Sequence, residues 1–178
     1  RIISDSTTDD FAKLRNMGLK LAINDWVLFI DADEVVTPQL RTEIENKINN
    51  TTVSGFLIQR RDFFLGKFLK HGETGNIKLL KLGNKENGKW VRNVHETWDI
   101  VGNVEPLEAC ILHFPHQTIQ EFIEHIDRWT TLDAVVFKMN SNKSSYLKIV
   151  FYPLAKFIQN YVIRFGFFDG MPGLIMAI

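Results

Sequence analysis

Two aspartates, Asp31 and Asp33, directly follow the apolar run Trp26–Ile30 and offer the clearest chemistry in this sequence. Such a run is typical of a short strand buried on both faces, as in a parallel sheet that binds ligands beyond the carboxyl ends of its strands. Residues two apart point to the same side of an extended chain, so the two carboxylates would converge and repel unless a cation joined them. Mg²⁺ and Mn²⁺ favour carboxylate oxygens and often bridge to substrate phosphates. We therefore predict a divalent-metal site here, with a solvated acidic turn as the alternative.

A glutamate and two histidines form a second group of candidates. His95 and Glu96 lie between apolar neighbours, and a glutamate placed beside a hydroxyl can act as a general base. The alternative for Glu96 is a surface residue paired with Arg92. His113 follows the predicted strand 107–112, where a neutral imidazole could bind a metal or could be a hydrogen-bonded structural residue.

Arg15 and the loop around residues 66–72 are further candidates for binding. Arg15 lies on a predicted helix, away from its apolar side, and could reach a base or a phosphate or simply face solvent. Gly66 and Gly72 could let an acceptor approach the backbone closely, or they could be turn glycines. His71, next to Gly72, could touch substrate or face solvent.

The elements that must position these residues alternate between helices and strands. A proline after Thr37 and a capping box beginning at Thr118 mark two of the helix starts. The hairpin or mixed loop expected at 60–67 contains Gly66. Predicted strands cover 26–30, 56–58, 77–80 and 107–112, and predicted helices cover 9–22, 38–48, 118–139 and 146–165, the last interrupted near Pro153.

Composition narrows the class of protein. The chain has 178 residues, of which 45% are hydrophobic, enough for one domain with its own core. Its formal net charge is +0, so no global basic field favours a nucleic-acid partner. Cys110 is the single cysteine, which excludes an internal disulfide and a cysteine-based zinc site.

The ordered set of motifs resembles family 2 glycosyltransferases with a GT-A fold. More narrowly, it resembles the bacterial branch that includes lipopolysaccharide core glucosyltransferases. The matching segments are Phe11-x-x-x-Arg15-Asn16-x-Gly18-Leu19, Asp25 to Glu34, Gly66-Lys67…His71-Gly72, Val94-His95-Glu96, Leu112-His113 and Gly166-Phe167-Phe168-Asp169-Gly170…Gly173-Leu174.

This resemblance implies an α/β fold of the GT-A type, a Rossmann-like mixed sheet flanked by helices. It implies a partial catalytic domain over 1–115, whose N-terminal nucleotide-binding unit is missing, and a helical extension over 116–178. The expected activity is metal-dependent, inverting transfer of a sugar from a nucleotide-sugar donor to a hydroxyl of a glycan or glycolipid. The expected process is the synthesis of lipopolysaccharide or another cell-envelope polysaccharide.

The resemblance also assigns roles to single residues, with Mg²⁺ or Mn²⁺ as the cofactor. Asp33 would be the main metal ligand, with Asp31 beside it and His113 completing the site. Glu96 would be the catalytic base. The donor-binding residues would be Asp31 and Arg15, and the acceptor-side residues would be Gly66, His71, Gly72 and His95.

The segment 146–165 interleaves aromatic and basic residues but contains no run of eighteen uncharged apolar residues. It predicts a cationic amphipathic helix lying in the lipid headgroup region, and the alternative is an ordinary helix packed on the sheet. Attachment to the inner face of the cell membrane, from the cytoplasmic side, would bring the enzyme to a lipid-linked acceptor.

Two other functions remain open. In a haloacid-dehalogenase-type phosphohydrolase, Asp31 would be the nucleophile and Asp33 the general acid, but no later strand ends in paired aspartates. A non-catalytic, membrane-associated binding domain is the other alternative. The presence of Asp31, Asp33, Glu96 and His113 together weighs against it.

Overall fold

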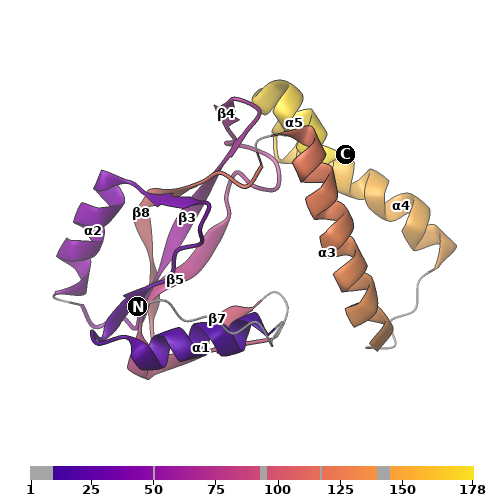
Figure 1. The fold of residues 1–178 in the computed structure, drawn as a ribbon. Helices are drawn as coiled ribbons and strands as arrows, with labels where there is room; N and C mark the ends of the chain where they lie inside the picture. Colours follow the sequence, from indigo (N-terminus) through magenta and orange to yellow (C-terminus); the bar gives the residue numbers. More distant parts are fainter. Residues whose placement is uncertain (1–9, 50, 93–95, 117, 140–144) are drawn as a thin grey trace. The chain divides into compact units, whose positions relative to one another are not determined.

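The computed structural model describes residues 10–49, 51–92, 96–116, 118–139 and 145–178 (Figure 1). These residues form two compact units. One comprises the described residues up to Gln59 together with Lys78–Ile111, and the other comprises Arg60–Ile77 and Leu112–Ile178. The predicted domain boundary between residues 115 and 116 stays a prediction.

The main sheet has the strand order β1-β5-β3-β8-β2, and β4 pairs with β3 outside that path. Where the register is given, β1 with β5, β5 with β3 and β3 with β4 are antiparallel. A separate antiparallel pair, β6 with β7, aligns Trp90 with Trp98. The bounds are β1 (Trp26–Leu28), β2 (Glu34–Val36), β3 (Gly55–Phe64), β4 (Lys67–Phe68), β5 (Lys78–Asn84), β6 (Gly88–Val91), β7 (Thr97–Ile100) and β8 (Val104–His113).

The first strand differs from its prediction as a doubly buried strand of a parallel sheet. β1 ends at Leu28, is half-buried, and lies at one end of the strand order, where it pairs antiparallel with β5. The apolar run continues past the strand because Phe29 packs elsewhere, with its ring 5.1 Å from that of Trp90 and 5.3 Å from that of Trp98. Ile30 is exposed. An apolar run alone therefore could not distinguish ladder residues from a side chain that packs against a second sheet.

The helices of the first unit begin with side-chain caps. In α1 (Phe11–Leu21), the Asp10 carboxylate accepts a hydrogen bond from the Lys13 backbone. In α2 (Pro38–Ile48), Thr37 Oγ1 accepts from the Leu40 backbone, as predicted.

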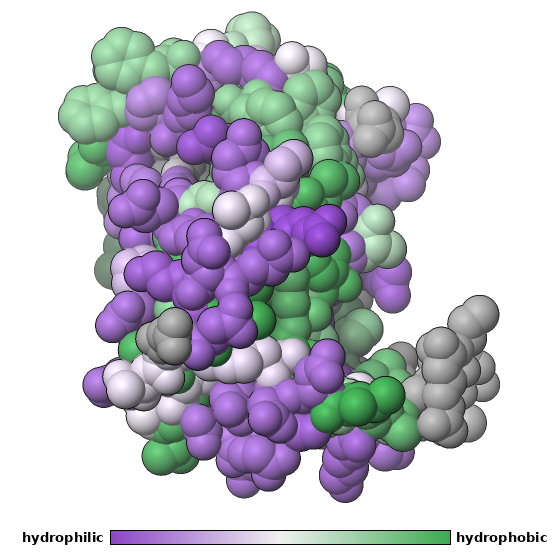
Figure 2. Space-filling model, turned by 90° about the vertical axis from the view of Figure 1, so that its left-hand side faces the viewer, coloured by the Kyte–Doolittle hydropathy of each residue, from purple (hydrophilic) through white to green (hydrophobic). Residues whose placement is uncertain are grey.

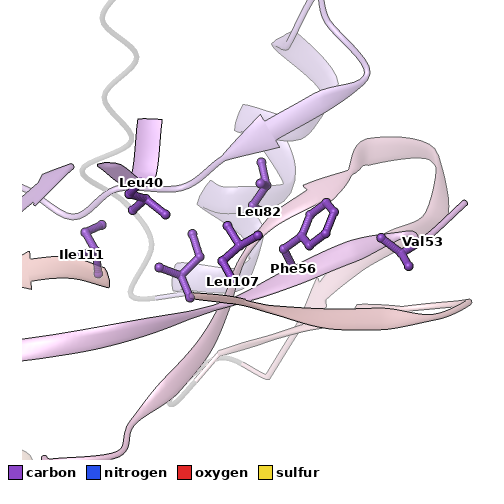
Figure 3. Packing of buried hydrophobic residues seen from close by; sticks show 7 residues of the cluster. Leu40, Val53, Phe56, Leu82, Leu107 and Ile111 are labelled. Atoms are coloured by element: carbon purple, nitrogen blue, oxygen red, sulfur yellow. The ribbon is translucent and has the colours of Figure 1, made fainter. Parts of the chain in front are cut away.

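The main core of this unit lies between α2 and the sheet. Figure 3 shows its side chains gathered from the helix and from β3, β5 and β8. Their burial removes the apolar side of α2 from water and fixes the helix that follows the acidic segment. The buried members are Leu40, Val53, Phe56, Ile58, Leu82, Leu107 and Ile111. The outer side of α2 is polar, with Arg41 and Glu45 paired 2.8 Å apart, and the face viewed in Figure 2 is mainly hydrophilic.

A second cluster joins α1 to the β6–β7 pair. Ala12 and Leu19 of the helix pack with Trp90 and Trp98. Asn16 adds a pair of polar contacts, donating to the Trp90 carbonyl at 2.8 Å and accepting from the Trp90 backbone N–H at 2.9 Å. These contacts hold the helix so that the neighbouring residue, Arg15, has a fixed position.

The second unit contains a hairpin and a series of helices. β3 turns into β4 through Leu65 and Gly66, whose φ angles of 45° and 86° suit a two-residue turn, so the hairpin expected at 60–67 is confirmed. α3 (Ile119–Met139) begins as predicted, with Thr118 Oγ1 accepting from the Glu121 backbone. The later elements are α4 (Tyr146–Phe157), the π-helix η2 (Ile158–Ile163), the 3₁₀-helix η3 (Gly166–Asp169) and α5 (Gly170–Ala177).

The interruption predicted near Pro153 lies further along the chain. The α-helix continues through Pro153, and the hydrogen-bonding pattern changes to that of a π-helix only at Ile158. The change coincides with Asn160, whose buried side chain donates to Glu73 at 2.9 Å. Among the helices described, none has the length and apolar character needed to span a bilayer.

Candidate functional site

Asp31 lies in the segment between β1 and β2, and both of its carboxylate oxygens contact protein cations. Oδ1 accepts from Arg15 Nη2 at 2.9 Å, and Oδ2 accepts from Lys81 Nζ at 2.7 Å. Burial by itself raises the pKa of Asp31, but the bonds from Lys81 and Arg15 outweigh burial and hold the pKa below its ordinary value. We expected a metal ion to offset the negative charge of Asp31, but two protein cations, Arg15 and Lys81, already do so.

Arg15 also reaches Glu96. Its Nε donates to Glu96 Oε1 at 2.9 Å, so one guanidinium joins the predicted donor-site carboxylate to the predicted base. The guanidinium carbon lies 4.7 Å from the ring centre of Trp90 and 5.6 Å from that of Phe29, which is cation–π geometry. The partner suggested for Glu96 by sequence was Arg92, its near neighbour, whereas the structure supplies an arginine 81 residues away.

Lys81 is a member of this site that the sequence analysis missed. Its ammonium lies 2.6 Å from Glu34 Oε2, and the Glu34 side chain is 0% exposed. The same Glu34 oxygen accepts from the Asp31 backbone N–H at 3.0 Å, so Glu34 supports the loop that carries Asp31. A lysine among the leucines of residues 79–82 was the available signal, because a buried ammonium needs acidic partners.

Asp33 lies in the turn before β2 and is exposed. Within the described part of the chain, no three histidine, cysteine or acidic side chains are grouped so that they could hold a metal ion. Mg²⁺ is commonly held by one or two carboxylates together with substrate phosphates rather than by a complete protein cage. An exposed Asp33 beside the Asp31 network fits that mode of binding.

His113 ends β8 in the second unit, whereas Asp33 belongs to the first. Its Nδ1 lies 2.9 Å from Oδ1 of Asp62, a buried carboxylate that also accepts from Arg60 Nε at 2.9 Å. Burial by itself raises the pKa of Asp62, but the interactions with His113 and Arg60 lower it by more, so the pKa lies below its ordinary value. Histidines that bind a metal through one ring nitrogen commonly contact a carboxylate through the other, and the contact with Asp62 is compatible with that pattern. The ligand role of His113 stays a prediction.

The predicted acceptor-side residues include two turn glycines and a histidine that is paired with a carboxylate. Gly66 and Gly72 both have left-handed φ angles, 86° and 70°, and Gly66 forms the hairpin turn. His71 pairs with Asp169, its Nδ1 3.2 Å from Oδ1 of that carboxylate. His95 lies outside the described residues.

Comparison with known proteins gives matches over most of the chain. The model of the family described as "Glycosyl transferase family 2" matches residues 1–100, which include Arg15, Asp31 and Glu96. An uncharacterized glycosyltransferase of Rickettsia typhi is 22% identical over 177 residues, covering 92% of this chain and 61% of the relative. A lipopolysaccharide core biosynthesis glycosyltransferase of Rhizobium meliloti, LpsC, is 23% identical over 178 residues, covering 94% of this chain and 66% of the relative. The chain thus spans only about three-fifths to two-thirds of the length of these relatives.

Proposed function

The chain belongs to glycosyl transferase family 2, and from that premise we propose that the protein moves a sugar from a nucleotide-sugar donor to a hydroxyl of a glycan or lipid-linked acceptor. The transfer is metal-dependent and inverting, and it serves lipopolysaccharide or related cell-envelope synthesis. The similarity to LpsC, at 23% identity, supports this choice of process.

One observation carries the proposal. Arg15 Nη2 lies 2.9 Å from Asp31 and Arg15 Nε lies 2.9 Å from Glu96, so one guanidinium bonds both the candidate donor carboxylate and the candidate base. A transferase needs its base close to the site where the donor is held, because the acceptor oxygen must reach the anomeric carbon. The contact of both Asp31 and Glu96 with Arg15 supports assigning them to one site, although they are 65 positions apart in the sequence.

Glu96 would act on the acceptor. Its carboxylate takes the proton of the acceptor hydroxyl while the hydroxyl oxygen forms a bond to the anomeric carbon and the bond to the diphosphate breaks. The Glu96 side chain is 16% exposed, and its Oε1 lies 2.9 Å from Arg15 Nε. Attack on the face opposite the departing diphosphate inverts the anomeric centre.

Asp33, with Asp31 beside it, would hold the divalent cation. Mg²⁺ or Mn²⁺ bound there would supply Lewis-acid stabilisation of the charge that develops on the leaving diphosphate. Arg15 and Lys81 keep Asp31 in place through both of its oxygens, so the acidic segment is ordered without relying on the ion. His113 remains the proposed third ligand.

The membrane part of the proposal rests on α4. None of its residues is buried, and Leu147 and Phe151 are 70% and 60% exposed. Lys148 and Lys156 add positive charge to the same helix, which suits an anionic lipid surface. Peripheral attachment at the cytoplasmic face would place the enzyme beside a lipid-linked acceptor.

A transfer assay tests the activity. The full-length protein is incubated with a panel of nucleotide-sugars, Mn²⁺ or Mg²⁺ and lipopolysaccharide core oligosaccharide, and release of nucleoside diphosphate is followed with and without the acceptor. We expect acceptor-stimulated release with one donor class. Hydrolysis of an aryl phosphate that is lost in Asp31→Ala, with no release of nucleoside diphosphate, would instead support the phosphohydrolase alternative.

A further inference from the structure

Asp169 is a buried carboxylate to which the proposed mechanism gives no role. It lies where η3 meets α5, and its side chain is 4% exposed. Its Oδ2 accepts from the backbone N–H groups of Lys70 and His71 at 2.9 Å and 2.8 Å. Its Oδ1 lies 3.2 Å from His71 Nδ1, so one carboxylate holds both the backbone and the ring of His71.

The local fold around Asp169 is tightly determined. Phe165 has a left-handed φ of 58°, and a Cβ on Gly166 would lie 2.6 Å from the Asn160 carbonyl oxygen. A Cβ on Gly173 would lie 2.9 Å from the Cβ of Asp169, so that position also requires glycine. The segment 166–173 therefore folds so closely that the carboxylate is fixed against residues 70 and 71.

The loop that carries His71 has other anchors, but they do not touch the imidazole. Gly72 donates from its backbone to the Arg164 carbonyl at 2.9 Å. Glu73 accepts from Lys156 Nζ at 2.8 Å and from Asn160 Nδ2 at 2.9 Å. Glu73 thus offers a matched control, since it anchors the same loop without contacting the ring.

Asp169 sets the chemistry of the His71 ring. Burial by itself raises the pKa of Asp169. The hydrogen bonds from the His71 backbone and ring and from the Lys70 backbone lower it by more, so the carboxylate is ionised at neutral pH. In the tautomer that carries its proton on Nδ1, facing this carboxylate, Nε2 is the hydrogen-bond acceptor of the ring. The His71 side chain is 34% exposed, so a ligand can reach it from solvent.

An exposed aromatic surface lies next to this ring. The Phe168 ring centre is 5.4 Å from that of His71, and Phe168 is 64% exposed. Phe167 is 4.4 Å from Phe168 and is also exposed. A sugar presents an apolar C–H face and a rim of hydroxyls, and an exposed ring beside an oriented hydrogen-bond acceptor matches both.

We infer that His71 and Phe168 form a subsite for the acceptor sugar, in which Phe168 stacks on the sugar face and His71 Nε2 accepts a hydrogen bond from a hydroxyl. Asp169 is the positioning residue, since it acts through His71. This inference rests on the proposed transferase function, and it extends that function by adding Phe168 and Asp169 to the acceptor-side residues.

Asp169→Asn gives the sharpest test. The asparagine oxygen can still accept the two backbone N–H groups, but its amide donates toward Nδ1 and so moves the ring proton to Nε2. We expect the ¹⁵N NMR shifts of His71 to report this tautomer change in the full-length protein. The acceptor KM should rise about tenfold, the size of one lost hydrogen bond, with the donor KM unchanged.

Glu73→Gln is the control, with an acceptor KM expected to stay within about twofold of wild type. Phe168→Leu should raise the acceptor KM several-fold, and Phe168→Tyr should not. Should Asp169→Asn fail to fold, His71→Phe removes the acceptor nitrogen, keeps a ring, and is expected to raise the acceptor KM likewise.

Three results would overturn the subsite while leaving the transferase intact. They are an unchanged acceptor KM in folded Asp169→Asn, an equal rise in Glu73→Gln, and a Phe168→Leu variant that loses only vesicle binding, which would assign the ring to a lipid surface. Absence of transfer in the wild type with every donor would instead remove the proposed function and the subsite with it.

Discussion

Lys81 and Asp31 are 50 residues apart in the chain, yet the Lys81 ammonium lies 2.7 Å from Asp31 Oδ2. The same ammonium contacts the fully buried carboxylate of Glu34. Lys81 therefore stabilises the acidic segment from within, and the ion pair is of the buried kind whose disruption leaves an uncompensated charge.

Lys81→Met should destabilise the fold by about 3–5 kcal/mol, because the buried Glu34 side chain would lose its cationic partner. Urea unfolding of the full-length protein measures this change. Lys78→Met is the matched control, since Lys78 begins the same strand with an exposed side chain, and its effect should stay within about 0.5 kcal/mol. Adding Glu34→Gln to Lys81→Met should recover part of the loss; no recovery would contradict the ion-pair explanation.

Glu96→Gln should reduce kcat by about 10²–10⁴-fold while leaving donor affinity near wild type, because glutamine keeps the contact with Arg15 but cannot take a proton. Steady-state kinetics of transfer, together with nucleotide-sugar binding by calorimetry, separate the two effects. Full turnover in this variant would remove Glu96 from the role of base.

Asp33→Asn should remove the effect of Mn²⁺ or Mg²⁺ on nucleotide binding. Without its charge, residue 33 is a weak ligand for a hard cation. The measurement is the shift in Tm on adding nucleoside diphosphate with the metal, and the same variant without the metal is the control. A metal-dependent shift equal to that of wild type would exclude Asp33 as the main ligand.

The double substitution Leu147→Asp and Phe151→Asp should abolish co-sedimentation of the full-length protein with anionic phospholipid vesicles. Both side chains are exposed on α4, and charged groups resist insertion at the interface. Ile23→Asp is the control, because Ile23 is also exposed but belongs to the segment after α1. Vesicle binding that survives the double substitution would show that α4 does not mediate it.

The lowered pKa of Asp169 predicts that the free energy of unfolding depends on pH. Burial by itself raises its pKa, but the hydrogen bonds from His71 and Lys70 lower it by more, so the folded-state pKa is depressed. A carboxyl with a depressed folded-state pKa adds stability above its unfolded pKa of about 3.9 and loses that contribution as pH falls through the folded value. The wild type should therefore lose unfolding free energy more steeply than Asp169→Asn between about pH 5 and pH 3, measured by urea unfolding. Parallel profiles would contradict this.

Local signals predicted the helix starts and much of the fold class. Thr37 and Thr118 cap the helices that they were expected to cap, because capping depends on residues close in sequence. The mixed α/β fold with helices flanking the sheet, and the GT-A type that the family match supports, are as predicted.

Long-range partners were harder to foresee. Lys81 lies in an apolar strand, and nothing near it in sequence marks Glu34 and Asp31 as its partners. The same holds for Phe29, whose ring packs against two tryptophans that only the fold brings near. The change to a π-helix likewise begins at Ile158, five residues after Pro153, and the segment includes Asn160, whose partner Glu73 is distant in sequence.

The single guanidinium that Arg15 shares between Asp31 and Glu96 has a consequence for mutagenesis. Substitutions at positions 31 and 96 will not be thermodynamically independent, because each changes the electrostatic partner of the other. A double-mutant cycle across the two sites should give a nonzero interaction energy that vanishes in an Arg15→Met background. Effects measured at either carboxylate alone will therefore include a contribution that belongs to the pair.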